Sequence, residues 1–240
     1  MTFCLFIVFR DPANPAARIS DAEHARLTAV LRSVPGLARA LVHTPAHAHD
    51  PLLDDGVPPQ LVLQLYFDRL LDFEAAAASA GPLQALAASD ALPTLVGAAV
   101  EQQVMAVRSY AVPDPASAAA LAQPWCTYLV AYEGPAEDLH AWLDDYLAHH
   151  TPLMARLPGI RALEVYTRVD CVSHLPWPRA TCMQRNKVAF DSPVALTAAL
   201  ASPLRHEMRA HFRALPRFSG GVTHFPMSTR AVLGAGGWRG

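Results

Sequence analysis

The same short segments occur twice in this sequence, in the same order and about 122 residues apart. Five pairs match: 3–9 with 125–131, 34–40 with 157–163, 66–68 with 189–191, 81–83 with 202–204, and 105–108 with 227–230. An offset that is kept over five anchors is the signature of a duplicated structural unit. The 240 residues are therefore expected to fold as two copies of one unit.

Each copy carries the same series of predicted elements. Apolar runs rich in aromatic and β-branched residues predict strands at 3–9, 37–43, 60–67 and 98–109, and again at 125–132, 160–168, 182–190 and 221–230. Apolar residues at helical spacing predict helices at 20–33, 70–79 and 82–89, and at 135–156, 192–201 and 203–214. Ser20-Asp-Ala-Glu23 is a capping-box pattern, Pro135 is expected at a first helical position, and both first helices are expected to end at Pro-Gly.

The order βαββαβ is that of a ferredoxin-like module, so the predicted fold class is α+β. One such module covers one face of its sheet with helices and leaves the other bare, and a second sheet must cover the bare apolar face. We therefore expect two tandem ferredoxin-like modules, 1–110 and 124–234, packed sheet to sheet as an intramolecular dimeric α/β barrel. Residues 111–123, rich in Pro, Ala and Ser, form the expected linker.

Composition limits the partners. Hydrophobic residues make up 52% of the chain and charged residues 17%, which is enough for a large core. The net charge is −2 and Lys187 is the only lysine, so nucleic acid and anionic membranes are not expected partners. The apolar N-terminal run is too short to span a bilayer. The four cysteines lack a Cys-x-x-Cys pair, and we expect buried thiols and a cytoplasmic protein.

The second copy contains Tyr146-Leu-Ala-His-His150-Thr-Pro-Leu followed by Pro158-Gly159, and later Phe190-Asp-Ser-Pro and the residues after it. In these segments it resembles EthD-like proteins of the dimeric α/β-barrel superfamily. It implies a preference for small hydrophobic, often aromatic ligands and does not identify a reaction. The first copy lacks the His-x-Pro-Leu segment, so the active site is expected in the second copy.

Several polar side chains of the second copy are candidate catalytic groups, because imidazole exchanges protons near neutral pH. His150 has the family's His position. The alternative is that it only packs near the end of its helix. Asp145 and His149, four residues apart, form a possible carboxylate–imidazole pair or lie on the solvated face. The other candidates are His206, His224 on the last strand, and Tyr128 on the first. His206 follows a Pro as in related polyketide cyclases, where Arg205 is an equally good alignment partner, and the alternative is that His206 lies on a surface helix.

Aromatic residues are expected to fill the core or to line the substrate pocket. The candidates for substrate binding are Trp125, Tyr146, Tyr166 and Trp177. Trp177 lies in a Pro-bearing loop, 171–180, and the first copy has a comparable loop at 47–59. Each loop is a candidate cover for a pocket mouth.

The segment His43-Thr-Pro-Ala-His47-Ala-His49-Asp50 has spacing that can bind a divalent metal. It is expected to be an irregular, solvated loop without a second ligand set, so no metal site is expected. No Gly-rich phosphate loop or dinucleotide fingerprint occurs, and no cofactor is expected.

Two functions remain open. The first is a cofactor-independent enzyme that acts on a small aromatic or polyketide-like compound by proton transfer, as a lyase, isomerase or cyclase, with a monooxygenase as the O₂-using variant. The second is a non-catalytic binding protein for a hydrophobic metabolite or a haem-like ligand. Homodimerisation of the pseudo-dimeric chain is left open.

Overall fold

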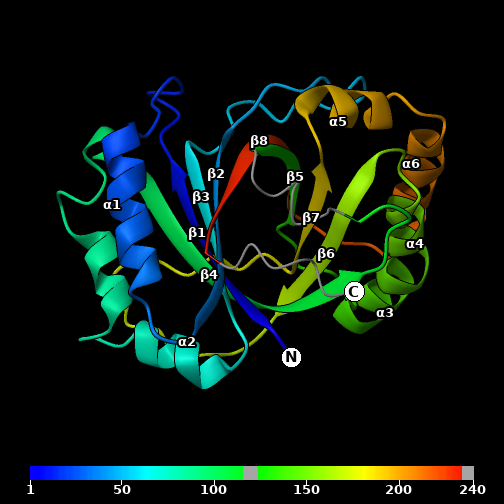
Figure 1. Ribbon diagram of the computed structural model, residues 1–240. Coiled ribbons are helices and arrows are strands. Elements are labelled where there is room, and N and C mark those ends of the chain that lie inside the picture. The colour runs from blue at the N-terminus through cyan, green and yellow to red at the C-terminus, as the bar shows by residue number, and fades with distance from the viewer. Residues whose placement is uncertain (116–123, 234–240) are drawn as a thin grey trace.

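Eight antiparallel strands form a closed barrel in the computed structural model, which describes residues 1–115 and 124–233 (Figure 1). Around the barrel the strands follow the order β1-β3-β2-β8-β5-β7-β6-β4. Their bounds are β1 Phe3–Arg10, β2 Leu37–Pro45, β3 Leu61–Phe67, β4 Ala99–Tyr110, β5 Trp125–Tyr132, β6 Ile160–Arg168, β7 Gln184–Phe190 and β8 Val222–Leu233.

Each copy contributes one four-stranded sheet, β4-β1-β3-β2 from the first and β8-β5-β7-β6 from the second. The two sheets join at both edges, through β2 with β8 and through β4 with β6. This closure leaves no free sheet edge among the described strands, and it turns the bare faces of the two sheets towards each other. The expected α+β fold, an intramolecular dimeric α/β barrel, is confirmed. The expected linker lies largely outside the described residues, at 116–123.

The helices cover the outer faces of the two sheets, with α1 and α2 on one side of the barrel and α3 to α6 on the other (Figure 1). The first module has α1 Asp21–Arg32, α2 Leu70–Ala76 and the 3₁₀ helices η1 Pro82–Ala87 and η2 Pro93–Leu95. The second has α3 Leu139–Asp145, the π-helical turn η4 Tyr146–His150, α4 Thr151–Ala155, α5 Pro193–Leu200 and α6 Leu204–Ala214. Helix α1 begins with the expected capping box, in which Ser20 and Glu23 exchange hydrogen bonds.

Two predictions about the first helix of the second module are wrong. Pro135 precedes the helix, with a cis peptide bond after Gly134, and α3 begins at Leu139 with Asp138 as its N-cap. The predicted continuous helix 135–156 is interrupted by η4, because one extra residue is accommodated there as a π turn. In the first module, the predicted helix at 82–89 is the 3₁₀ helix η1.

The match between the first strands of the two copies is also wrong by one residue. Phe3 pairs with Phe67, and its counterpart pairing is Cys126 with Phe190, so Cys4 and Cys126 are not equivalent. Cys4 lies inside the barrel, whereas Cys126 faces the helices of its own module. A shift of one residue exchanges the two faces of a strand. Residues of the same type in the two strands therefore have different environments.

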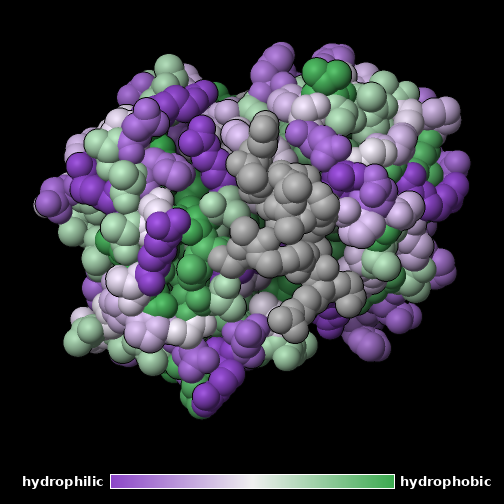
Figure 2. Space-filling view, in the orientation of Figure 1, coloured by the Kyte–Doolittle hydropathy of each residue, from purple (hydrophilic) through white to green (hydrophobic). Residues whose placement is uncertain are grey.

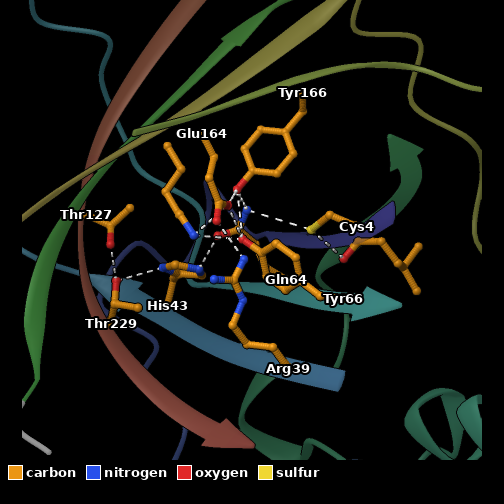
Figure 3. A network of polar contacts seen from close by, with 11 residues as sticks. Cys4, Arg39, His43, Gln64, Tyr66, Thr127, Glu164, Tyr166 and Thr229 are labelled. Atoms are coloured by element: carbon orange, nitrogen blue, oxygen red, sulfur yellow. Dashed lines mark hydrogen bonds and ion pairs between the residues drawn. The ribbon is translucent and has the colours of Figure 1, made fainter. Parts of the chain in front are cut away.

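A connected polar network occupies part of the barrel interior (Figure 3). Glu164 lies at its centre, with its carboxylate 2.7 Å from both Lys187 Nζ and Arg39 Nη2, and it accepts hydrogen bonds from Tyr66 and Tyr166. Gln64, His43, Thr229 and Thr127 continue the network through successive hydrogen bonds. Burial opposes ionisation of Glu164, but the two cations lower the pKa of its carboxyl to about 2, so it is a carboxylate. The network joins side chains of both modules and fixes how the two sheets meet.

The outer surface is mixed in character. Figure 2 shows mostly hydrophilic residues on the two flanks and a strip of hydrophobic residues in the middle of this face, beside the atoms drawn in grey. Within the described residues, no helix has the length and apolar character needed to cross a membrane.

Candidate functional site

A cavity of about 390 Å³ lies in the second module, between its sheet and the helices η4 to α6. This volume falls in the range of small-molecule sites, about 300–1,000 Å³. Its walls are mostly apolar and aromatic. They include Val130, Tyr132, Met154, Leu157, Val188, Phe190, Leu196, Leu200, Met208, Phe212, Phe218 and Val222. The polar residues that line it are Tyr128, Tyr146, His150, Asn186, Arg205, Arg209 and His224.

A loop of the first module, residues 46–60, helps to form this site of the second. Leu53 lines the cavity, and the His49 backbone amide donates to Thr197 Oγ1 on α5 at 3.0 Å. Asp50 and Asp55 of the same loop bind side chains of the cavity wall. The loop was expected to cover a pocket mouth. It belongs to the first module but reaches the cavity of the second.

His224 and Asp55 form a carboxylate–imidazole pair at the cavity. Asp55 Oδ2 lies 2.8 Å from His224 Nδ1 and also accepts the His224 backbone N–H at 2.7 Å. An imidazole that donates Nδ1–H to a carboxylate keeps its Nε2 lone pair free to accept a proton. No described residue makes a hydrogen bond to His224 Nε2, and the ring lies 5.7 Å from that of Tyr128.

Arg205 of α6 is buried beside the cavity with its charge partly compensated. Its Nη2 donates to Asp50 Oδ2 at 2.8 Å, and the same oxygen accepts the Tyr128 hydroxyl at 2.7 Å. Burial would raise the pKa of Asp50, but hydrogen bonds from the Leu52 backbone, Tyr128 and Arg205 lower it overall, so Asp50 is ionised. The Nε of Arg205 is buried and has no hydrogen-bond partner among the described residues. A buried guanidinium donor without a partner is costly, and an oxygen of a bound ligand would satisfy it.

His150 and Tyr146 come from η4 and line the helical side of the cavity. Tyr146 is fully buried and accepts a hydrogen bond of 2.6 Å from Asn186 Nδ2. His150 Nδ1 lies 3.3 Å from Nδ1 of His211 on α6. Burial, with the nearby His211 and Arg205, lowers the pKa of His150 to about 3, so its ring is neutral.

The structure brings four of the eight predicted site residues to the cavity, namely His150, His224, Tyr128 and Tyr146. The other four lie elsewhere. Trp125 and Tyr166 point into the barrel, because their positions alternate with those that face the helices. Trp177 packs against Phe9 in the core of the first module. His206 is on the exposed face of α6.

The histidine-rich segment of the first module does not form one site. His43 belongs to β2, not to an irregular loop, and is fully buried between Thr229 and Gln64 in the barrel. His47 and His49 are exposed, and Asp50 binds Arg205 and Tyr128. The three histidines are separated because β2 extends to Pro45 and places His43 inside the barrel.

The sequence did not point to Asp55 or Asn186, and it pointed to Asp50 only as part of a candidate metal segment and to Arg205 only as an alternative to His206. The acidic pattern in Asp50-Pro-Leu-Leu-Asp-Asp-Gly56 was the available signal for the loop. Two of its partners, Arg205 and His224, lie about 155–170 residues further along the chain, so only the closed barrel brings them together. Arg205 was visible as a neighbour of His206, but the helix turns Arg205 inward and His206 outward.

Solved structures share the architecture of this chain. A structure described as an anthrone oxidase-like protein aligns over 96% of this chain and 93% of its own, with 13% identity and a TM-score of 0.59. A putative monooxygenase from Lactobacillus acidophilus NCFM aligns over 99% and 97%, with 13% identity and a TM-score of 0.51. An EthD-family protein from Bacillus halodurans C-125 covers 41% of this chain and 96% of its own, with 19% identity and a TM-score of 0.34.

This chain has the dimeric α/β-barrel fold. At these identities the likeness concerns the fold and not the activity. The sequence matches no known protein-family description and no curated protein. The function of this dimeric α/β barrel has to be argued from its own cavity.

Proposed function

We propose that the second module binds a small aromatic ketone or phenol and removes a proton from it, without an organic cofactor. The observation that carries this proposal is the meeting of His224–Asp55 and Arg205 at a cavity whose walls are otherwise mostly apolar. A base and a fixed cation at a mostly apolar site are suited to the formation of an enolate or phenolate.

In the proposed step, His224 Nε2 takes the proton from a carbon that is next to the substrate carbonyl or, as in anthrone, conjugated with it through the aromatic rings. The electron pair of the broken C–H bond moves to the carbonyl oxygen, which becomes an enolate. Arg205 Nε donates to that oxygen and satisfies its own missing hydrogen bond. Asp55 holds the ring of His224 in one orientation and stabilises the imidazolium that forms.

Return of the proton to another carbon gives an isomerase, and expulsion of a leaving group gives a lyase. Attack of the enolate on a carbonyl of the same substrate gives a cyclase. If the enolate instead reacts with O₂, the same site gives a monooxygenase. The fold neighbours described as anthrone oxidase-like and as a putative monooxygenase are compatible with that last branch.

Anthrone, a tricyclic ketone with an acidic CH₂ group, is a suitable probe for both stages. Under argon in D₂O, the protein should catalyse exchange of the CH₂ protons for deuterium, followed by proton NMR. In air, oxygenation would follow the balance anthrone + O₂ → anthraquinone + H₂O, measured as oxygen uptake. We expect the substitution His224→Gln to lower the exchange rate by about 10²–10⁴-fold, the usual contribution of a positioned base.

His140→Ala is the matched control, because His140 lies exposed on α3 and has no part in the cavity. Exchange that is equally fast in wild type and in His224→Gln would contradict the assignment of the base. Saturable binding of the probe without any exchange would favour the alternative function, a binding protein for hydrophobic metabolites. A Soret band on addition of haem would favour the haem-binding form of that alternative.

A further inference from the structure

A second cluster of polar side chains lies behind the cavity, where the end of α3 and η4 meet α6. Asp145, His149 and His211 each offer one ligand atom, and these atoms lie within 4.8 Å of one another. The Asp145 carboxylate is 2.8 Å from His149 Nδ1 and 3.7 Å from His211 Nε2. The three ligands come from two separate helical segments, so the fold, and not local sequence alone, brings them together.

We propose that Asp145, His149 and His211 bind one divalent transition-metal ion, with zinc as the best match. Two bonds of about 2.0–2.1 Å at a tetrahedral angle place their ligand atoms about 3.4 Å apart. This value lies between the two spacings from Asp145, 2.8 Å to His149 and 3.7 Å to His211. Two neutral imidazoles and one carboxylate suit zinc and its neighbours in the first transition row, whereas calcium and magnesium prefer oxygen ligands only. Three protein ligands leave one position for water.

The proposed ion connects to the cavity through His211. When Nε2 of His211 binds the metal, Nδ1 must carry the proton of that ring. This Nδ1 lies 3.3 Å from His150 Nδ1, so His211 becomes the donor and His150 the acceptor. The other ring nitrogen of His150 then carries a proton, and His150 becomes a hydrogen-bond donor in the cavity wall. The metal therefore sets the tautomer of a residue that lines the cavity.

Metal binding can be tested without knowledge of the substrate. Protein stripped with a chelator is titrated with ZnCl₂ by calorimetry, and Co²⁺ is added separately to record its visible absorption. We expect saturable uptake of one ion per chain and the intense visible bands of low-coordinate cobalt. The substitution His211→Ala should weaken zinc binding by more than the roughly 10–100-fold that loss of an outer-shell partner costs.

Asp145→Asn provides a second ligand variant if His211→Ala fails to fold, and His140→Ala is the control on the same helix as Asp145. Binding that is absent in wild type, unchanged in both ligand variants, or reduced as much by His140→Ala would overturn the proposal. The link to the cavity has its own readout in long-range ¹H–¹⁵N spectra of the imidazole rings. Zinc should leave Nδ1 of His150 unprotonated, and an unchanged His150 signal in the zinc-bound protein would refute that link.

Discussion

The two modules have the same frame but fill the space beneath their helices differently. Strand pairing makes Leu5 equivalent to Tyr128 and Gln102 equivalent to His224. Sequence position gives two further equivalent pairs. Gln84 and Arg205 each follow a Pro-Leu pair, and Leu27 and His150 lie at the same distance before the Pro-Gly that ends each first helix. At each of these four positions, the second module has the more polar or more readily charged residue.

The crossed loops make the same point. In the second module Asp55 of the first-module loop binds His224. In the first module, the amide of Gln102 binds the backbone carbonyls of Leu175 and Trp177 in the second-module loop. Leu175 and Trp177 also pack into the apolar core of the first module. The two modules therefore have equivalent loop contacts, of which one combines amide hydrogen bonds with apolar packing and the other holds a carboxylate–imidazole pair.

The largest expected effect concerns the network that both modules share. Glu164→Gln should destabilise the fold by about 3–5 kcal/mol, because it removes the buried carboxylate that lies 2.7 Å from both Lys187 and Arg39. Urea unfolding measures this change. If the modules form one unit, the variant should still unfold in a single transition. Two separate transitions would show that the modules fold independently.

A double variant sharpens that test. Glu164→Gln removes the carboxylate from two cations, Lys187 and Arg39, and replacing Lys187 as well leaves only Arg39 without it. Glu164→Gln combined with Lys187→Met should therefore be more stable than Glu164→Gln alone. A double variant as unstable as the sum of the two single variants would mean that the pair does not interact in the way the structure shows.

The next largest effect should come from giving the second module a residue of the first. Arg205→Gln gives the second module the residue that the first module has at the equivalent position, Gln84. We expect the exchange rate with anthrone to fall by about 10²–10³-fold, since one donor to a developing oxyanion is lost. Gln84→Ala is the control, and it should leave the rate unchanged. Equal losses in both variants would mean that the difference between the halves is not functional.

Asp55→Asn tests whether the first module contributes to the site of the second. Asp55 is a positioning residue, because it contacts His224 and is not proposed to touch the substrate. We expect kcat to fall by about 10–100-fold with little change in KM, since binding by the apolar walls is intact. Asp55→Glu should restore part of the rate. A change confined to KM would instead indicate that the loop only closes the cavity.

Much of the fold could be predicted from the sequence, because the repeat, the Pro-Gly stops and the capping box are local signals with direct physical causes. The interior of the strands was harder to predict. A shift of one residue between equivalent strands is difficult to detect by comparing the two sequence segments. It nevertheless decides whether Trp125 faces the barrel interior or the cavity.

The site was predicted only in part for a related reason. His150 and His224 stood out by residue type, but what holds His224 comes from the other copy, and Arg205 was hidden next to a more conspicuous histidine. Contacts between a loop at 46–60 and residues beyond 200 depend on barrel closure, which no local pattern encodes. The acidic residues of this loop suggested a polar contact, but no sequence pattern identified the residues that they bind.

The smallest expected effect concerns how the caps of α1 and α3, the first helices of the two modules, contribute to stability at different pH values. Glu23 of α1 accepts hydrogen bonds from the Ser20 backbone and from both the backbone and the side chain of Thr94. Burial opposes its ionisation, but these bonds lower its pKa to about 2 from the usual value near 4.5. Because the folded-state pKa is the lower one, this stabilisation is present above pH 4.5 and is lost as the pH falls towards 2.

Glu23→Gln should therefore destabilise the protein at pH 6 by on the order of 2 kcal/mol and by only about a quarter as much at pH 2.5. Unfolding curves at the two pH values measure the difference. The first helix of the second module is capped by Asp138, whose side chain receives a single backbone hydrogen bond, from Ala141. Asp138→Asn is the matched variant and keeps an acceptor there, so it should change the stability at pH 6 by less than Glu23→Gln does. An equal effect would mean that the buried cap of the first module contributes no more to stability than the exposed cap of the second module.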